Sequence, residues 1–304
     1  MIRIFATDGM DKAAIKALEE KGCEVRTDFY EPEALCEAVK ECDVLVVRSA
    51  TKVRVPQIDA AAAAGRLKLI IRAGVGIDNI DAAYAKEKGI EVTNTPKASS
   101  DAVAELALAH MFSVARFISD AGHSMREGRW EKKAYKGIEL TGRTVGIVGY
   151  GRIGQALGKR CQALGMNVLA YDIFKVPGLE CETMRYAELD ELLASSDIIS
   201  LHVPSLEGQP FVNRESIAKM KDGVIIINTS RGTNVDEAAL FEALESGKVY
   251  GAGLDVYSAE PMTASPLFTH PRVSCTPHIG ANTNEAQSRI GRELVSIISD
   301  RFAL

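Results

Sequence analysis

The sequence predicts an α/β protein made of two doubly wound domains, each built on a parallel sheet. Three observations support this prediction. Short segments rich in Val and Ile alternate with helical segments up to Thr95, a second series of the same kind begins near Thr144, and a long helical segment lies between them. Near-continuous apolar strands are typical of parallel sheets covered on both faces, and two alternating series indicate two domains.

Length and composition agree with this fold class. The chain has 304 residues, of which 46% are hydrophobic and 25% charged, enough to build two buried cores. The net charge of −5, with acidic and basic residues interspersed, argues against binding to nucleic acid or to an anionic membrane surface. An anionic substrate must therefore be attracted by local arginines.

Targeting and redox signals are absent from the sequence. No apolar stretch approaches the roughly 20 residues that span a bilayer, and the first residues lack the apolar core of a signal peptide. The six cysteines are scattered without C-x-x-C spacing, so we expect neither a disulfide framework nor a metal site. These features predict a cytoplasmic enzyme.

The first alternating series contains five predicted strands. They occupy residues 2–7, 23–27, 43–49, 68–74 and 90–95. Residues 99–128 follow with apolar positions at helical spacing and no proline, which predicts one long helix.

The second series contains six predicted strands, with helices between most of them. They occupy residues 144–149, 167–172, 197–203, 223–230, 251–257 and 272–276. Residues 283–304 then predict one amphipathic helix.

The run GIVGYGRIG at residues 146–154 opens the second series with the pattern G-x-G-x-x-G. A predicted strand precedes it and a predicted helix follows, which is the context that a dinucleotide-binding turn requires. Gly149 permits the tight turn, Gly151 lets a pyrophosphate approach the backbone, and Gly154 allows close packing of helix and strand. Free N–H groups at the helix start would face the phosphates.

Asp172 ends the next predicted strand, 18 residues after Gly154. A carboxylate there accepts hydrogen bonds from the adenine ribose hydroxyls and repels a 2′-phosphate, which favours NAD over NADP. Residues 72–79, RAGVGIDN, also follow a predicted strand but have Asn79 at the place of the third glycine. We interpret this second turn as a loop whose backbone N–H groups bind a carboxylate.

A nicotinamide cofactor needs a group that moves a proton while the hydride moves, and histidine is the usual one. Of five histidines, His110 lies among apolar residues of the long helix and is interpreted as packing. His202 and His278 both follow predicted strands, where ligands meet the carboxyl edge of a parallel sheet, so position alone leaves both open. Arg231, also after a strand, can bind a carboxylate through two hydrogen bonds.

The ordered motifs GYGRIG, NTSRGTNVDEAAL, GAGLDVYSAEP and TPHIGANT resemble those of the D-isomer-specific 2-hydroxyacid dehydrogenases over nearly the whole chain. The resemblance implies a catalytic set of Arg231, Glu260 and His278. Within the family, LVVRSATKV, RAGVGIDNID and HIGANTNEAQ look most like the D-3-phosphoglycerate dehydrogenases. It would be a short form without the C-terminal regulatory domains of longer relatives.

The same resemblance implies the domain arrangement. The NAD-binding Rossmann domain, residues 99–282, is expected to be inserted into a flavodoxin-like substrate domain made of residues 1–98 and 283–304. The long helix near Ser99 would carry the chain across. Family members are usually homodimers, with that helix and the following segment in the contact.

The resemblance also implies binding residues. The residues expected to bind the cofactor are Gly149, Gly151, Arg152, Ile153, Gly154, Asp172, His202, Pro204, Thr229, Ser230, Asp255 and Gly280. Asp255 is expected at the carboxamide end of the nicotinamide. The residues expected to bind the substrate are Arg48, Ser49, Arg72, Gly74, Val75, Gly76 and Lys133.

Arg48 and Arg72 end two predicted strands of the first domain, and two arginines at strand ends favour a phosphorylated acid. The expected reaction is the NAD-dependent oxidation of D-3-phosphoglycerate, a step of serine biosynthesis. Reduction of hydroxypyruvate or glyoxylate, which needs no phosphate site, is the alternative. An NADH-sensing corepressor is a third reading, although the chain shows no disordered tail beyond its last helix.

Overall fold

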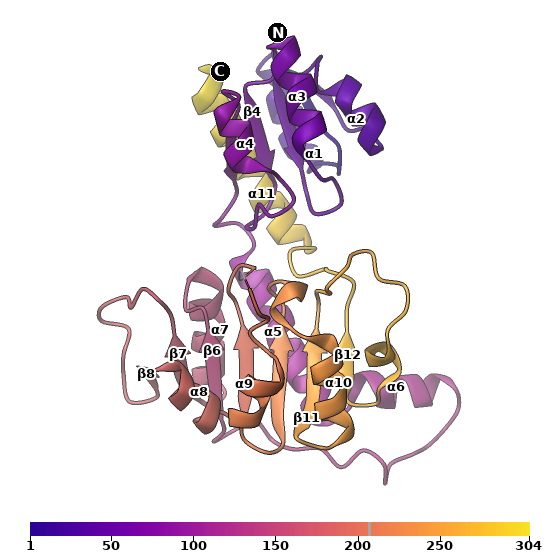
Figure 1. The fold of residues 1–304 in the computed structure, drawn as a ribbon, viewed down its shortest axis with the longest axis vertical. Coiled ribbons are helices and arrows are strands. Elements are labelled where there is room, and N and C mark those ends of the chain that lie inside the picture. Colours follow the sequence, from indigo (N-terminus) through magenta and orange to yellow (C-terminus); the bar gives the residue numbers. More distant parts are fainter. Residues whose placement is uncertain (206–207) are drawn as a thin grey trace. The chain divides into compact units, whose positions relative to one another are not determined.

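The computed structural model describes residues 1–205 and 208–304 and divides into two compact units (Figure 1). Unit 1 comprises Met1–Ser100 and Ala281–Leu304, and unit 2 comprises Asp101–Gly280. Each predicted domain boundary lies two residues from these bounds. Unit 2 interrupts unit 1 in the sequence, and the last helix therefore belongs with the first hundred residues.

Unit 1 is built on a five-stranded parallel sheet with the order β2-β1-β3-β4-β5, which is the flavodoxin-like order. Its strands are β1 (Arg3–Ala6), β2 (Glu24–Arg26), β3 (Val44–Val47), β4 (Leu69–Arg72) and β5 (Glu91–Asn94). Its helices are α1 (Lys12–Glu20), α2 (Pro32–Ala38), α3 (Val55–Ala64), α4 (Ala82–Glu87) and α11 (Asn284–Phe302).

Helices cover both faces of this sheet. Leu18 of α1 packs with Ile290 and Leu294 of α11 against one face, and Leu35 of α2 packs with Ile58 of α3 against the other. Because both faces are covered, the central strand β3 is wholly apolar and fully buried.

Unit 2 is built on a seven-stranded parallel sheet with the order β12-β11-β10-β9-β6-β7-β8. This is the dinucleotide-binding order with one added edge strand. Its strands are β6 (Thr144–Val148), β7 (Asn167–Tyr171), β8 (Met184–Tyr186), β9 (Ile198–Leu201), β10 (Val224–Asn228), β11 (Val249–Leu254) and β12 (Val273–Cys275). Its helices are α5 (Ser100–Arg116), α6 (Ile118–Arg126), α7 (Arg152–Ala163), α8 (Leu189–Ser195), α9 (Arg214–Lys219) and α10 (Glu237–Glu245), with 3-10 turns η1 (Gly232–Asn234) and η2 (Pro266–Thr269).

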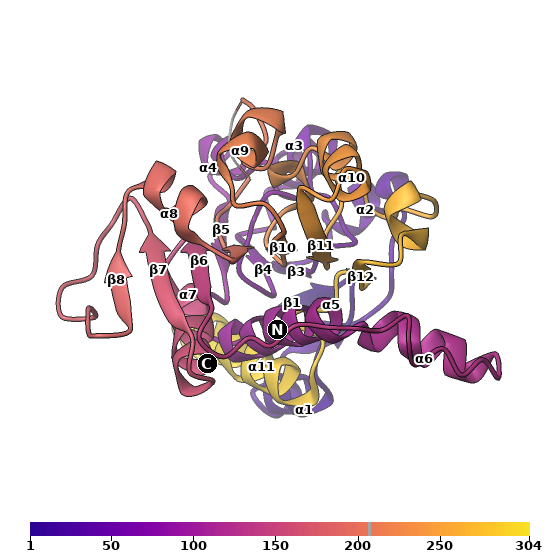
Figure 2. The same cartoon turned by 90° about the horizontal axis from the view of Figure 1, so that it is seen from below.

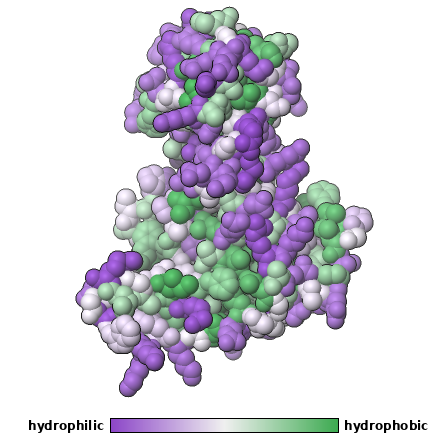
Figure 3. Space-filling view, turned by 180° about the vertical axis from the view of Figure 1, so that it is seen from behind, coloured by the Kyte–Doolittle hydropathy of each residue, from purple (hydrophilic) through white to green (hydrophobic). Residues whose placement is uncertain are grey.

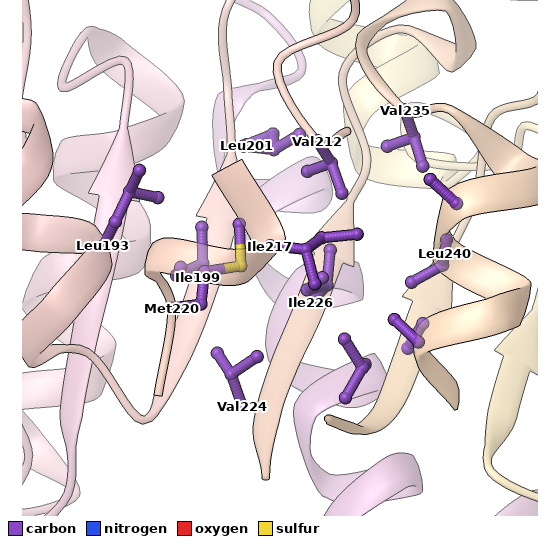
Figure 4. Packing of buried hydrophobic residues seen from close by; sticks show 14 of the residues in the cluster. Leu193, Ile199, Leu201, Val212, Ile217, Met220, Val224, Ile226, Val235 and Leu240 are labelled. Carbon is purple, nitrogen blue, oxygen red and sulfur yellow. The ribbon is translucent and has the colours of Figure 1, made fainter. Parts of the chain in front are cut away.

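Two hydrophobic clusters hold unit 2 together. Helices α5 and α7 pack on one face of the sheet, and α8, α9 and α10 pack on the other. Figure 4 shows the second cluster, in which Ile217 and Met220 lie over Ile199 and Ile226 of the central strands. The prediction of two doubly wound α/β folds is confirmed.

The prediction of a single long helix over residues 99–128 is wrong. Phe117 adopts a left-handed conformation with φ of 55°, and α5 and α6 meet there at a bend of 67°. The carbonyl oxygen of Ala115 accepts a hydrogen bond from the Ile138 N–H at 2.9 Å, so it is taken by a returning segment and not by the next helical turn. Such a distant partner leaves no signal in the local sequence.

The bend also bears on membrane crossing. Among the described residues, no single helix is long and apolar enough to span a bilayer, and only α5 with α6 passes that test as a bent pair.

Candidate active site

The candidate catalytic residues lie at one edge of the unit 2 sheet. Because its named strands pair in parallel, their carboxyl ends share an edge, where ligands bind in open α/β sheets. Arg231 follows β10, Glu260 follows β11 and His278 follows β12, and these three strands are neighbours. The glycine-rich turn follows β6 at the same edge.

The turn between β6 and α7 has the geometry of a phosphate site. Gly149 has φ of 90°, and a side chain there would meet the His202 carbonyl at 2.5 Å. At Gly154 a side chain would meet the Gly149 carbonyl at 2.3 Å, whereas Gly151 faces open space. Gly151 is also the N-cap of α7, with no side chain capping the helix, so the first N–H groups remain available to an anion.

Asp172 lies half-buried at the end of β7, where it supports the same turn. One carboxylate oxygen accepts the Tyr150 N–H at 2.7 Å, and the other accepts the Phe174 N–H at 2.9 Å. Each oxygen has a second lone pair, so the carboxylate can still accept from ribose hydroxyls.

Two buried polar atoms in this part of unit 2 lack a partner among the described residues. They are Nδ1 of His202, after β9, and Oγ1 of Thr229, after the neighbouring β10. Burial lowers the pKa of His202 to about 4, so its imidazole is neutral. Buried polar groups are nearly always paired. Two such atoms beside an open glycine turn fit a polar cofactor.

His278 and Glu260 form a close pair. Nδ1 of His278 lies 2.6 Å from a carboxylate oxygen of Glu260, and the other carboxylate oxygen accepts the Tyr257 N–H at 3.1 Å. A carboxylate only accepts, so Nδ1 carries the hydrogen and Nε2 of the neutral ring is the free basic nitrogen. This arrangement orients an imidazole for proton exchange through Nε2.

The environment of Glu260 keeps it ionised. Burial alone would raise its pKa, but the hydrogen bond and charge of His278, the Tyr257 N–H and the charge of Arg231 lower the pKa below its ordinary value. A proton taken up by Nε2 therefore gives an imidazolium beside the negative charge of Glu260.

Arg231 sits on a turn that the chain fixes from several sides. Asn228, fully buried, donates to the Arg231 carbonyl at 2.8 Å and accepts from the Ser230 N–H and hydroxyl. A side chain at Gly232 would meet the Tyr257 carbonyl at 1.8 Å, so the Arg231 turn packs directly on the loop that carries Glu260. Arg231 also donates from Nη1 to the Ser230 carbonyl at 2.6 Å.

The turn that carries His278 is held by Asp255. His278 has φ of 53°, and its N–H donates to the Asp255 carbonyl at 2.8 Å. The carboxylate of Asp255 accepts the N–H groups of Ile279 and Gly280, each at 2.8 Å. Asp255 is 1% exposed, and burial raises its pKa above the ordinary value, although these bonds and that of Thr276 oppose the rise. Asp255 thus supports the turn, a part that the sequence did not predict.

The predicted substrate residues of unit 1 lie on two loops at the ends of β3 and β4. Asp8 accepts the N–H groups of Arg48 and Thr51, and the Asn79 amide donates to the carbonyls of the same two residues at 2.7 Å. Asn79 stands where the third glycine of the pattern would be in the second turn. Its two hydrogen bonds hold the Arg48 loop in place.

The loop with Gly74, Val75 and Gly76 begins directly after Arg72. The Arg72 guanidinium lies over Gly74, occupying the space that a side chain there would need. Val75 is partly exposed, and its carbonyl accepts from the Asn94 amide.

Lys133 is not brought together with the catalytic residues of unit 2. It lies exposed on residues 127–143, which run from the end of α6 to the amino-terminal end of β6 (Figure 1). The catalytic residues lie at the opposite edge of the sheet.

Sequence reasoning missed the residues that support these turns. They are Asp8 in unit 1 and Asn228, Asn234 and Thr276 in unit 2. Asn234 donates to the carbonyls of Val203 and Pro204, which ties the segment after β9 to the Arg231 turn. For Asp8, Asn228 and Thr276 the only signal is a polar residue at or close to the carboxyl end of a strand, whereas Asn234 lies further on, in the 3-10 turn η1.

Comparison with known proteins identifies the family. The family model described as D-isomer specific 2-hydroxyacid dehydrogenase, NAD binding domain, matches residues 108–280. Hydroxypyruvate reductase of Thermotoga maritima is 52% identical over 301 residues, covering 97% of both chains. D-3-phosphoglycerate dehydrogenase of Methanocaldococcus jannaschii is 47% identical over 296 residues, covering 96% of this chain and 56% of its own.

A solved structure agrees with these relatives. D-lactate dehydrogenase from Aquifex aeolicus, complexed with NAD and lactic acid, has a TM-score of 0.85 and 32% identity, covering 99% of this chain and 95% of its own. These matches agree with the glycine turn of unit 2 and with the unpartnered polar atoms beside it. The chain belongs to the D-isomer-specific 2-hydroxyacid dehydrogenases and is an NAD-dependent oxidoreductase.

Proposed function

We propose that the protein oxidises D-3-phosphoglycerate to 3-phosphohydroxypyruvate with NAD. The observation that carries this choice is the pair of arginines at adjacent strand ends in unit 1. Arg72 pairs with Val47 in the sheet, and Arg48 is the next residue along the chain. The loop that follows Arg72 carries the N–H groups of Val75 and Gly76, which suit a carboxylate, while the Gly74 N–H is bonded to the Arg72 carbonyl.

In the proposed mechanism, Arg231 binds the carboxylate and the C2 oxygen of the substrate. Nε2 of His278 removes the hydroxyl proton, and Glu260 holds Nδ1–H and stabilises the imidazolium that forms. NAD, when bound, would supply the acceptor for the C2 hydride. In the reverse direction Nε2 returns the proton to the carbonyl oxygen. Thr229, Ser230, His202 and Pro204 are proposed to contact the cofactor.

Reduction of hydroxypyruvate is the second candidate. It is favoured by the relative of that name, which is 52% identical over 97% of both chains. Hydroxypyruvate differs from 3-phosphohydroxypyruvate by the phosphoryl group alone, so the same catalytic residues would serve both. Only the residues that would bind the phosphate distinguish the two candidate functions.

Arg48→Ala is expected to raise KM for 3-phosphoglycerate at least about tenfold and KM for D-glycerate less than about twofold. The reason is that a charge-assisted hydrogen bond contributes about 1.5–3 kcal/mol, and only the phosphorylated acid would lose it. NADH formation from both acids measures this effect. Arg26→Ala is the matched control, because Arg26 also ends a strand of unit 1 but is bound to Glu24 at 2.6 Å.

The wild-type protein should also use 3-phosphoglycerate at least about ten times better than D-glycerate, as judged by kcat/KM, for the same charge-assisted bond. Equal use of the two acids, with efficient reduction of hydroxypyruvate, would overturn the phosphate assignment in favour of the second candidate.

We further propose that the protein is a homodimer formed through α5 and α6. Figure 2 shows α6 extending away from the sheet of unit 2, and Figure 3 shows hydrophobic side chains gathered on the face of unit 2 that carries α5 and α7. Ile118 and Met125 are 56% and 54% exposed, and they line a groove with Phe112. An exposed apolar groove of this kind is typical of a protein interface.

Light scattering should give twice the chain mass for the wild type, and the double variant Ile118→Glu, Met125→Glu should give one chain mass. The introduced carboxylates would be buried without partners in the interface. Phe29→Glu, at an exposed phenylalanine of unit 1, should leave the dimer intact. A monomeric wild type would contradict the proposal.

A further inference from the structure

His110 on α5 is a buried histidine that the proposed chemistry does not use. It is 2% exposed, and both ring nitrogens have partners from or next to β12: Nδ1 lies 2.9 Å from the Ser274 hydroxyl, and Nε2 lies 3.0 Å from the Thr276 hydroxyl. Gly253 of β11 leaves the space for it, because a side chain there would meet Cβ of His110 at 2.5 Å. The fold therefore provides both space and two polar partners for an imidazole here, where an apolar side chain would use only the space.

The contact between Thr276 and Asp255 sets the direction of the hydrogen bonds made by His110. The Thr276 hydroxyl lies 2.6 Å from a carboxylate oxygen of Asp255, and that carboxylate already accepts two backbone N–H groups. Thr276 has one hydroxyl hydrogen, which it donates to the carboxylate, so it can only accept from His110. Nε2 of His110 consequently carries its hydrogen.

The protonation state of His110 determines the direction of its second hydrogen bond, to Ser274. Burial lowers its pKa to about 4, so the ring is neutral and Nδ1 is an acceptor for the Ser274 hydroxyl. Every donor therefore points the same way, from Ser274 through His110 and Thr276 to the carboxylate of Asp255. Hydrogen bonds aligned in this way strengthen one another in a low-dielectric interior.

Asp255 connects this network to the turn that carries His278. Its carboxylate binds the N–H groups of the two residues after His278, and its carbonyl binds the N–H of His278 itself. His278 adopts φ of 53°, a conformation that a residue other than glycine keeps only when its surroundings enforce it. The hydrogen bonds to Asp255 hold His278 in this conformation.

We propose that His110 is a positioning residue that, through Thr276 and Asp255, fixes the turn of residues 276–280 and so the imidazole of His278. This inference rests on the proposed role of His278 in proton transfer. It goes beyond that role because His110 lies on a helix on one face of the sheet, and its ring hydrogen-bonds to Ser274 and Thr276 instead of to the proton-transfer pair.

The pair His110→Gln and His110→Asn tests the proposal. The amide nitrogen of Gln reaches about as far from the backbone as Nε2 of His, so it can still donate to Thr276. The amide of Asn reaches only as far as Nδ1, so it can still meet Ser274 but not Thr276. The two variants therefore divide the two contacts of one ring between them.

His110→Asn is expected to lower kcat about 10- to 100-fold, because small misplacements of a catalytic group have effects of that size. His110→Gln should retain at least about half of wild-type kcat, since the Thr276 contact is kept. Both variants should bind NADH, measured by fluorescence titration. Equal losses in the two variants, or wild-type kcat in both, would overturn the proposal.

A second pair guards against variants of His110 that fail to fold. Thr276→Ser keeps the hydroxyl that links His110 to Asp255, whereas Thr276→Val keeps only the shape. Serine should preserve kcat and valine should lower it about tenfold or more, and equal behaviour would contradict the proposal. His278→Ala, assayed in parallel, distinguishes failure of the positioning role of His110 from failure of the proposed function. Unchanged turnover in that variant would refute the catalytic role of His278 itself.

Discussion

Replacement of His278 by alanine is expected to lower kcat by about 10²- to 10⁴-fold, the usual contribution of a positioned acid–base group. Because Nδ1 of His278 is held by Glu260, Nε2 is left to exchange a proton with the substrate, a role that imidazoles commonly have in enzymes. NADH binding should persist, because the glycine turn and Asp172 lie at other strand ends of unit 2. Steady-state kinetics with the preferred substrate and NADH titration measure the two quantities.

His123→Ala is the matched control for this variant. His123 also has a carboxylate partner, Glu127 at 3.1 Å, but it lies exposed on α6. Its loss should leave kcat within about twofold, since surface pairs contribute little. A His278 variant that performs as well as the His123 variant would remove His278 as the proton carrier.

Replacement of Arg231 by alanine is expected to lower kcat/KM at least about 100-fold, in both reaction directions. Two charge-assisted hydrogen bonds to a substrate carboxylate and oxygen contribute about 1.5–3 kcal/mol each. Arg231→Lys should recover only a small part, because an ammonium group cannot reproduce the planar two-point contact. Initial rates over a range of substrate concentrations provide the measurement.

Arg214→Ala tests whether the loss of any guanidinium in unit 2 has this effect. Arg214 binds Glu242 through two hydrogen bonds on the exposed surface of α9 and α10. We expect near wild-type kcat/KM for that variant. If the Arg231 and Arg214 variants were equally active, the proposed substrate contact of Arg231 would be wrong.

The elements that the sequence predicts well are those with a local signal. Apolar strands such as β3 and β10, and the strand–turn–helix around Gly149, are specified by residues adjacent in the chain. The three-residue strand β8 has no such signal, because Met184–Tyr186 is too short to show a period. The bend at Phe117 depends on the Ile138 N–H, which lies 21 residues further along the chain.

The candidate site shows the same division. Arg231, Glu260 and His278 can be named from motifs, but the contacts that position them cannot. The motifs name Asp255 only as a cofactor residue, and Asn228 looks like an ordinary strand-end polar residue; only the fold shows the turns that both hold. His110 looks like packing because its partners, Ser274 and Thr276, are 164 and 166 residues away in the sequence.

The proposed mechanism requires Arg231 and His278 to act on one substrate. A crystal structure of the protein with NADH and a non-reacting 2-oxo acid analogue, such as oxamate, tests this most directly. We predict that Nε2 of His278 and the guanidinium of Arg231 both lie within hydrogen-bond distance of the analogue, with Glu260 still on Nδ1. An analogue bound beside the nicotinamide without contact to Nε2 of His278 would contradict the proposed mechanism.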